Sequence, residues 1–264
     1  MASPAMTHNS GAAALATSLG ALALGARPVS LAEEQILPVL PPLMSLLPEG
    51  GLRRGTVTEI SGGTGAVSLA MALVVAAVSS GRWMAVVGAP GTSNGISNGR
   101  DVSGALGLSA AREMGLSLER LVMVDVPPRD RVDDRSSGEG IGWATVVAAC
   151  LDAFEVVLTW PPRRASASDG RRLAARLRER GSVMLTMGDG PFQPDLRLDV
   201  IEATWTGLGH GHGHLRERRV TIEATGRRGA SRPRRSQVLL PDADGALAII
   251  EPMGAVASLN ARAR

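Results

Sequence analysis

The feature that most constrains the fold is a glycine loop set between an expected strand and an expected helix. Val57–Ile60 is a short run rich in β-branched residues, Ser61–Gly65 is the glycine loop, and Ala66–Val78 is a long apolar segment. The order strand, glycine loop, helix is the order in which phosphate-binding loops are built. In such loops the backbone N–H groups and the helix N-terminus face the phosphates, and a lysine neutralises their charge. The stretch therefore predicts an α/β fold with the shape of a nucleotide site.

The loop lacks the residue that would make it a working nucleotide site. The G-x-x-x-x-G-K-[ST] pattern requires a lysine directly before a serine or threonine, but Val67 precedes Ser68, and the loop is about one residue short. All 28 basic residues are arginine, so no lysine can reach the loop from elsewhere. We interpret Gly62, Gly63, Gly65 and Ser68 as a vestigial phosphate loop in a degenerate nucleotide site, and we expect no cofactor.

The rest of the chain alternates short apolar runs with helical segments. Strands that are nearly all apolar, each followed by a helix, indicate a mainly parallel sheet flanked by helices on both faces. After Gly188 turns join the expected strands, which predicts an antiparallel C-terminal extension. The expected later strands are 84–87, 121–126, 154–159, 183–187, 196–205, 220–224, 237–240 and 246–250, and the expected helices are 67–80, 102–114, 143–153 and 170–180, the last of them capped by Asp169.

One stretch before the loop carries a family resemblance. Pro48–Ile60, PEGGLRRGTVTEI, resembles the entry to the RecA-type ATPase core, where a G-G-L-x-x-G turn leads into the first core strand. Together with the order of elements over roughly 37–251, the chain resembles the RecA-like mutasome proteins of the ImuA (ImuA-prime) type, within the RecA/SulA-like superfamily. The resemblance implies a RecA-like P-loop core over 48–251, an N-terminal peripheral segment over 1–47 and a C-terminal tail over 252–264.

The same resemblance implies a function. It implies a non-catalytic accessory protein of a DNA-damage-induced (SOS) mutasome, which binds a Y-family polymerase-like adaptor of the ImuB type. An error-prone C-family polymerase would be an indirect partner in translesion DNA synthesis. Two other classes are open, a RecA-paralogue ATPase of recombination and a SulA-like inhibitor of cell division. A RecA-fold protein of unrelated role is a third.

Two further positions bear on whether the protein is an enzyme. A RecA-type ATPase carries a carboxylate after its second strand to polarise the attacking water, but 84–87 leads into Gly88, Ala89 and Pro90. It also carries an aspartate at the end of a hydrophobic strand to hold Mg²⁺, where this chain has Thr159 and Trp160. With the lysine also missing, we predict no ATP hydrolysis and no catalytic residues.

Charge is distributed unevenly along the chain. Residues 1–160 carry 10 arginines against 14 acidic residues, whereas residues 161–264 carry 18 arginines against 11. The basic C-terminal part could contact nucleic acid or an acidic partner, although a solvated surface is the alternative and the stacking aromatics of single-stranded DNA-binding proteins are absent. Our candidate contacts for the partner or for single-stranded DNA are Arg171, Arg172 and Arg176 on the basic helix, and Arg227, Arg228, Arg232, Arg234 and Arg235 in an expected loop between strands.

Cysteine use and hydropathy bear on location. The single cysteine, Cys150, lies in an apolar run, excludes an intramolecular disulfide and fits a reducing compartment. No window reaches the roughly 18 apolar residues of a membrane span. The Ala12–Ala26 run lacks the preceding basic residues of a signal peptide. We therefore expect a cytoplasmic protein with no membrane partner. Three closely spaced histidines at 210, 212 and 214 alternate with glycine, and we interpret them as loop composition, with no metal site predicted.

Overall fold

The structure is a computed structural model, and it describes residues 35–89, 106–126, 142–208, 213–227 and 232–250. A nine-stranded sheet runs through them, in the order β11-β10-β9-β8-β3-β7-β6-β4-β5. The strands are β3 (Val57–Gly62), β4 (Met84–Val87), β5 (Leu121–Val124), β6 (Val156–Thr159), β7 (Val183–Met187), β8 (Leu196–Trp205), β9 (Arg218–Gly226), β10 (Arg234–Leu239) and β11 (Ala248–Ile249).

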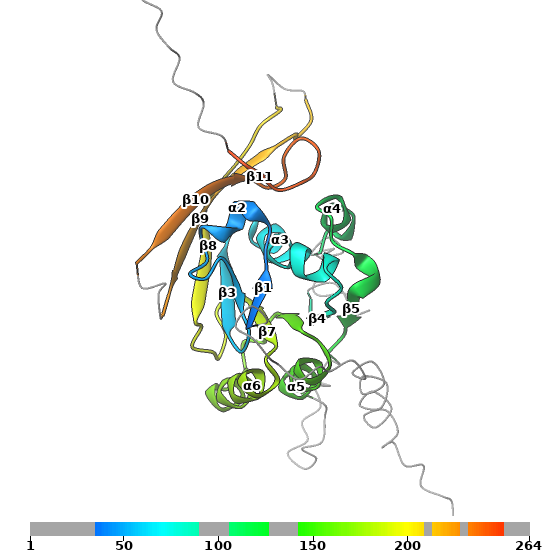
Figure 1. The fold of residues 1–264 in the computed structure, drawn as a ribbon, viewed down its shortest axis with the longest axis vertical. Helices are drawn as coiled ribbons and strands as arrows, with labels where there is room; N and C mark the ends of the chain where they lie inside the picture. The colour runs from blue at the N-terminus through cyan, green and yellow to red at the C-terminus, as the bar shows by residue number, and fades with distance from the viewer. Residues whose placement is uncertain (1–34, 90–105, 127–141, 209–212, 228–231, 251–264) are drawn as a thin grey trace, which may run out of the picture.

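The direction of the strands changes at β8, as the sequence predicts. Every pair from β8 through β3, β7, β6 and β4 to β5 is parallel, and β9, β10 and β11 then add antiparallel to the other side of β8. An α/β architecture with a mostly parallel sheet and an antiparallel C-terminal extension is therefore confirmed (Figure 1).

Helices cover both faces of the parallel half. α3 (Ala66–Ser79) and α4 (Leu108–Glu113) pack on one face, and α5 (Trp143–Ala153) and α6 (Ala167–Arg180) pack on the other. Because side chains alternate along a strand, each strand contributes to both sides. The first face includes Ile60, Val86, Leu158 and Leu185, and the second includes Val57, Ala85, Val157 and Met184.

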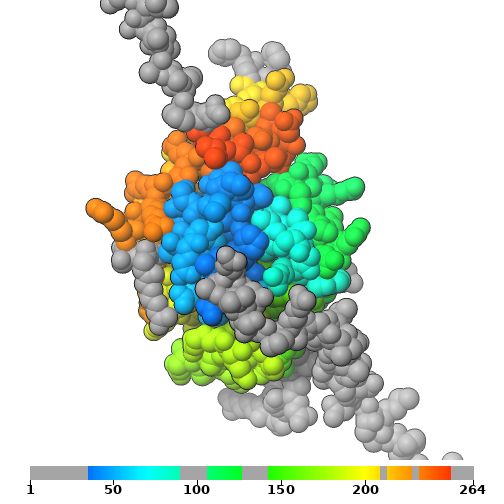
Figure 2. Space-filling model, in the orientation of Figure 1, coloured from blue at the N-terminus to red at the C-terminus, as the bar shows by residue number. Residues whose placement is uncertain are grey.

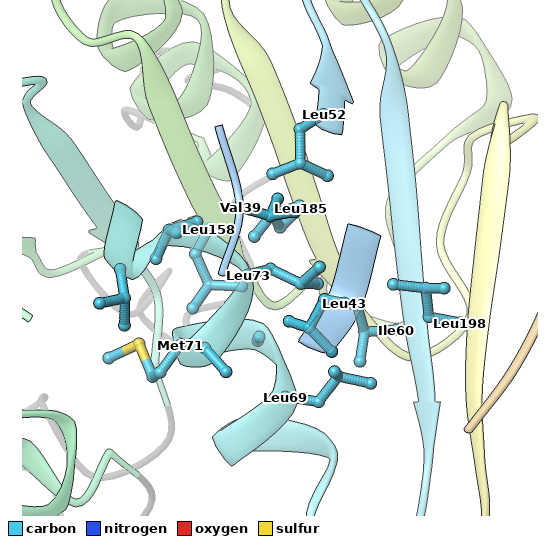
Figure 3. Close-up of a cluster of buried hydrophobic side chains, with 14 of the residues drawn as sticks. Val39, Leu43, Leu52, Ile60, Leu69, Met71, Leu73, Leu158, Leu185 and Leu198 are labelled. Carbon is cyan, nitrogen blue, oxygen red and sulfur yellow. The ribbon is translucent and has the colours of Figure 1, made fainter. Parts of the chain in front are cut away.

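α3 is the central helix of the core. Ten of its 14 residues are buried, because the sheet lies on one side and the segment that precedes β3 lies on another. That segment forms β1 (Ile36–Pro38), α2 (Pro41–Met44) and β2 (Gly51–Arg53), with β1 and β2 paired antiparallel. Figure 3 shows Leu43 and Leu52 of this segment reaching Leu73 of α3 and Leu185 of β7. In Figure 2 the same segment, in blue, lies between the orange C-terminal strands and the cyan α3.

Several elements differ from expectation in their bounds, and two of them, α6 and β10, carry candidate arginines. α6 begins three residues earlier than predicted, because Ser166 rather than Asp169 is the N-cap. The Ser166 side chain accepts from the Asp169 N–H, and the Asp169 carboxylate accepts from the Ser166 N–H, which is a capping box. β10 begins at Arg234, so Arg234 and Arg235 lie in a strand and not in the expected loop.

Two other expectations concern burial and membranes. Cys150 is buried in α5, and burial raises the pKa of its thiol to about 12, which makes it an unreactive core residue. Among the helices of the described residues, none has the length and hydropathy to cross a membrane.

Candidate functional site

The glycine loop follows β3 directly and is a tight turn. Gly62 still pairs with Val200 of β8, and α3 begins at Ala66, so only Gly63, Thr64 and Gly65 connect strand to helix. Gly62 has φ 104°, and a Cβ there would lie 2.5 Å from the carbonyl oxygen of Val200. The phosphate-loop pattern has four residues between its glycines, enough to wrap around a phosphate group. Here Gly62 instead permits a close approach of β3 to β8.

Arg218, the first residue of β9, lies against this loop. Its Nη2 donates to Ser68 Oγ at 2.7 Å, and its Nε donates to the backbone carbonyl oxygen of Leu240 at 2.6 Å. A Cβ at Gly65 would lie 3.6 Å from Arg218 Cζ. In a working phosphate loop the hydroxyl at the Ser68 position coordinates Mg²⁺. In this protein that hydroxyl accepts a hydrogen bond from a side chain of the same chain.

The Arg218 guanidinium is buried without an acidic counter-ion. The residue is 6% exposed, and within the described residues it forms no ion pair. Burial lowers the pKa of its guanidinium from the usual value, although arginine retains its charge in proteins. The Trp205 ring lies 5.0 Å from Arg218 Cζ and supplies a cation–π contact. The charge is therefore stabilised by a carbonyl, a hydroxyl and an aromatic ring.

Sequence reasoning missed Arg218, although a signal for it exists. Arg218, Val220, Ile222 and Ala224 alternate along β9 and share its buried face. We predicted the strand to begin at Val220, which left Arg218 outside it. An arginine two residues before a buried valine, in phase with the strand, is the pattern that would have identified it.

The strand end where an ATPase would hold Mg²⁺ carries a buried hydrogen bond instead. Thr159, at the end of β6, is 0% exposed. Its Oγ1 accepts from Trp143 Nε1 of α5 at 2.8 Å and donates to the carbonyl oxygen of Val87 at 3.2 Å. Beyond Val87, the described residues Gly88 and Ala89 carry no carboxylate. The polar groups at these strand ends join α5, β6 and β4 to one another.

A buried carboxylate lies on the α5–α6 face of the sheet, next to the loop-bearing end of β3. Glu59 pairs in register with Thr186 of β7 on one side and Arg197 of β8 on the other. Glu59 is 2% exposed, and Arg197 Nη1 lies 2.7 Å from its Oε1. Within the described residues, Thr186 Oγ1 has no hydrogen-bond partner. Burial raises the pKa of Glu59, the charge of Arg197 opposes this shift, and Asp189 and Asp199 add to it.

Glu59 is therefore expected to make stability depend on pH. A raised folded-state pKa favours folding below the unfolded-state value of 4.5, and this contribution is lost as the pH rises through the folded-state pKa. We expect Glu59→Gln, which retains an oxygen to accept from Arg197, to remove that loss and to be more stable than wild type at neutral pH. Urea unfolding at a series of pH values from 4 to 8 measures the difference. Glu119→Gln, at an exposed site, controls for the change in net charge. If the stability of Glu59→Gln differed from that of wild type by the same amount at every pH, the prediction would be wrong.

The first arginine cluster lies along α6 and divides into two groups. Arg171 and Arg172 are exposed, and Arg172 forms a surface ion pair with Asp169 at 3.1 Å. Arg176 instead forms a bidentate ion pair with Asp152 of α5, which Arg180 joins at 2.9 Å. Although burial acts in the opposite direction, the hydrogen bonds and charges of these two arginines lower the pKa of the Asp152 carboxyl. Arg176 therefore fastens α6 to α5 in the folded protein.

The second cluster does not form one loop surface. Arg234 donates to the carbonyl oxygen of Leu47 at 2.9 Å, and Arg235 pairs with Glu223 across the strands at 2.5 Å. The placement of these two residues in a loop is thus wrong, because backbone pairing with β9 continues through them. Arg227 and Arg232 are exposed, and Arg228 lies outside the described residues.

The histidines and other metal ligands add no site. His210 and His212 lie outside the described residues, and His214 is exposed. The described parts of the chain contain no group of three or more His, Cys, Asp or Glu residues arranged to hold a metal ion.

Comparison with known proteins identifies a sequence family that matches the first part of this site. The family model of the MT3502 N-terminal domain matches residues 45–96 and 102–192, just over half of the chain. The uncharacterized protein Rv3395c of Mycobacterium tuberculosis is 32% identical over 151 residues, which cover 56% of this chain. The chain thus spans 59% of the length of that relative. The family match includes the glycine loop and both helix layers and ends before β8, so Arg218 lies outside it.

Proposed function

The chain belongs to the MT3502 N-terminal domain family, and we propose that it is a non-catalytic, RecA-like accessory protein of a DNA-damage-induced mutasome. It would bind a Y-family polymerase-like adaptor of the ImuB type in the cytoplasm and support error-prone translesion synthesis, with a C-family polymerase as an indirect partner. The protein would contribute binding surfaces and not turnover.

The observation that carries this proposal is the contact between Arg218 and Ser68. A loop that lacks lysine, is too short to surround a phosphate and has its hydroxyl bonded to Arg218 is the geometry expected of a nucleotide site that has become structural. The RecA-type resemblance of Pro48–Ile60 supports the choice of a RecA-like protein. The sheet supports it too, because RecA-type cores also end with strands that add antiparallel to a parallel half.

The test is damage-induced mutation frequency in a deletion strain complemented with wild type or with Ser68→Ala. We expect deletion to reduce induced mutation to background with normal recombination, and both complementing alleles to restore it at equal protein levels. Ser68→Ala removes the hydroxyl that an ATPase needs for Mg²⁺ but only one hydrogen bond from this protein.

Four outcomes would contradict the proposal. Unchanged mutagenesis in the deletion strain would remove the mutasome assignment. A recombination defect, or failure of Ser68→Ala to complement, would indicate a RecA-paralogue ATPase. Filamentation on overexpression without an effect on mutagenesis would indicate a SulA-like inhibitor of division.

A further inference from the structure

Arginines that are far apart in the sequence lie around α6 and at the end of the sheet opposite the glycine loop. The turn between β2 and β3 packs on the C-terminal end of α6, where the Gly55 N–H donates to the carbonyl oxygen of Ser182 at 2.7 Å. Arg54 Nη1 donates to the carbonyl oxygen of Gly181 at 3.0 Å. A Cβ at Gly55 would lie 3.3 Å from Arg178 Cα. The turn that contains Arg54 and directly follows Arg53 therefore lies beside Arg178, an exposed residue of α6.

A fourth arginine comes from the end of β9. Arg53 and Arg227 line the same pocket, a hollow with a volume of about 60 Å³ between β2 and the ends of β8 and β9. The Arg227 N–H donates to the carbonyl oxygen of Asp195 at 2.9 Å, and its Nη1 donates to Gln193 Oε1 at 3.1 Å. The loop that contains Gln193 leads back to α6, because Pro191 packs on Gly170.

The surface so formed, Arg53, Arg54, Arg171, Arg178 and Arg227, is called the arginine surface below. Arg171 and Arg178 are seven residues apart on α6, two turns along one side, which is about 10 Å. This distance corresponds to about three phosphates along one strand of B-DNA. Figure 2 shows α6, in yellow-green, exposed at the lower end of the molecule.

Two acidic residues nearby, Asp169 and Asp195, have other partners. Asp195 Oδ2 accepts from the Val57 N–H at 3.1 Å, and Asp169 completes the capping box of α6. The charge of Glu179 acts on Arg176. In the described parts of the chain, Arg171 and Arg178 form no ion pair. The pair between Arg53 and Glu49 is exposed, and such pairs contribute little, so phosphate can replace the carboxylate.

We propose that the arginine surface binds the phosphate backbone of DNA. Guanidinium groups bind phosphate oxygens in a bidentate fashion. Surfaces that bind proteins usually carry aromatic anchor residues. No Trp or Phe lines this pocket, and two of its apolar residues, Leu52 and Leu196, are buried. Without stacking aromatics, binding is independent of base sequence and governed by salt. The proposal rests on the proposed function for the choice of DNA as the polyanion.

The test measures binding by the purified full-length protein. Fluorescence anisotropy is recorded with a labelled single-stranded oligonucleotide of roughly 30 nucleotides, its duplex, and poly-glutamate, between about 50 and 200 mM salt. The triple variant Arg171→Gln, Arg178→Gln, Arg227→Gln is compared with Arg112→Gln, Arg216→Gln, Arg219→Gln. The second triple removes the same charge from exposed sites elsewhere.

We expect both oligonucleotides to bind, and the first triple to weaken single-strand binding roughly tenfold or more at the lowest salt. Its slope of log K against log salt should fall by about 2, since each lost phosphate contact removes about 0.7. The control triple should retain the wild-type slope. No binding of either oligonucleotide, equal losses in the two triples, or tighter binding of poly-glutamate than of DNA would overturn the proposal. Mutagenesis is measured separately in cells, so a failure of the DNA-binding proposal can be distinguished from a failure of the proposed function.

Discussion

Arg218→Ala is expected to lower the free energy of unfolding by about 3 kcal/mol, or roughly 6 to 12 °C in Tm for a chain of this size. The substitution leaves the buried carbonyl oxygen of Leu240 without its donor from the side chain, removes the bond to Ser68 Oγ and removes the contact with Trp205. Losing a partner of a buried polar group costs about 1 to 3 kcal/mol, and more when the partner is charged. Urea unfolding followed by circular dichroism measures the change.

The neighbouring Arg219 provides a matched control. It is exposed on the opposite face of β9, so Arg219→Ala should change stability by no more than about 0.5 kcal/mol. Arg218→Met, which retains an apolar stem of similar length, should still lose about 2 kcal/mol because the Leu240 oxygen is left unpaired. Equal effects of Arg218→Ala and Arg219→Ala would show that the contact between β9 and the glycine loop contributes nothing to stability.

Gly170→Ala is expected to destabilise the protein by about 3 kcal/mol, although replacing glycine by alanine inside a helix usually stabilises it. In a helix interior, alanine is favoured over glycine by about 1 kcal/mol. In α6, however, a Cβ at Gly170 would lie 2.0 Å from the carbonyl oxygen of Pro191 and 2.7 Å from its carbonyl carbon. Both contacts are with backbone, so α6 or the loop after β7 must move. Thermal unfolding measures the loss.

Gly63→Ala is the control for this substitution. A Cβ at Gly63 would meet no atom within 4 Å, and the residue is exposed, so its replacement should be nearly neutral. If Gly170→Ala were as stable as wild type, the loop at Pro191 would have to move away from the new Cβ with no loss of unfolding free energy. That result would also count against the packing of this loop on α6, which is the contact that places Arg227 near α6 on the arginine surface.

Much of the fold could be predicted from the sequence because it is recorded in local patterns. Apolar runs such as 84–87 and 183–187 can be buried on both faces only in a covered parallel sheet, and they form β4 and β7 there. The missing lysine and the shortened loop are equally local, since they are read from adjacent residues. Bounds were less accurate where a side chain decided them, as with Ser166 at the start of α6.

The candidate site could be predicted only in part. The glycines and Ser68 lie within a few residues of one another, but Arg218 is 150 residues from Ser68 and joins it only after β8 and β9 have added to β3. The surroundings of Glu59 could not be predicted either, because Thr186 and Arg197 become its neighbours only through the register of β7 and β8 with β3.

The main strands and helices, the covered parallel sheet and the loss of the phosphate-loop lysine follow from the sequence alone, because each depends on periodicity or on adjacent residues. The tertiary structure alone decided that Arg218 bonds to the Ser68 hydroxyl, that Arg176 fastens α6 to α5, and that Arg53 and Arg227 line one pocket. The physical reason is that hydrogen bonds and charge pairs act over a few ångströms of space. The chain brings such partners together only through strand order and packing.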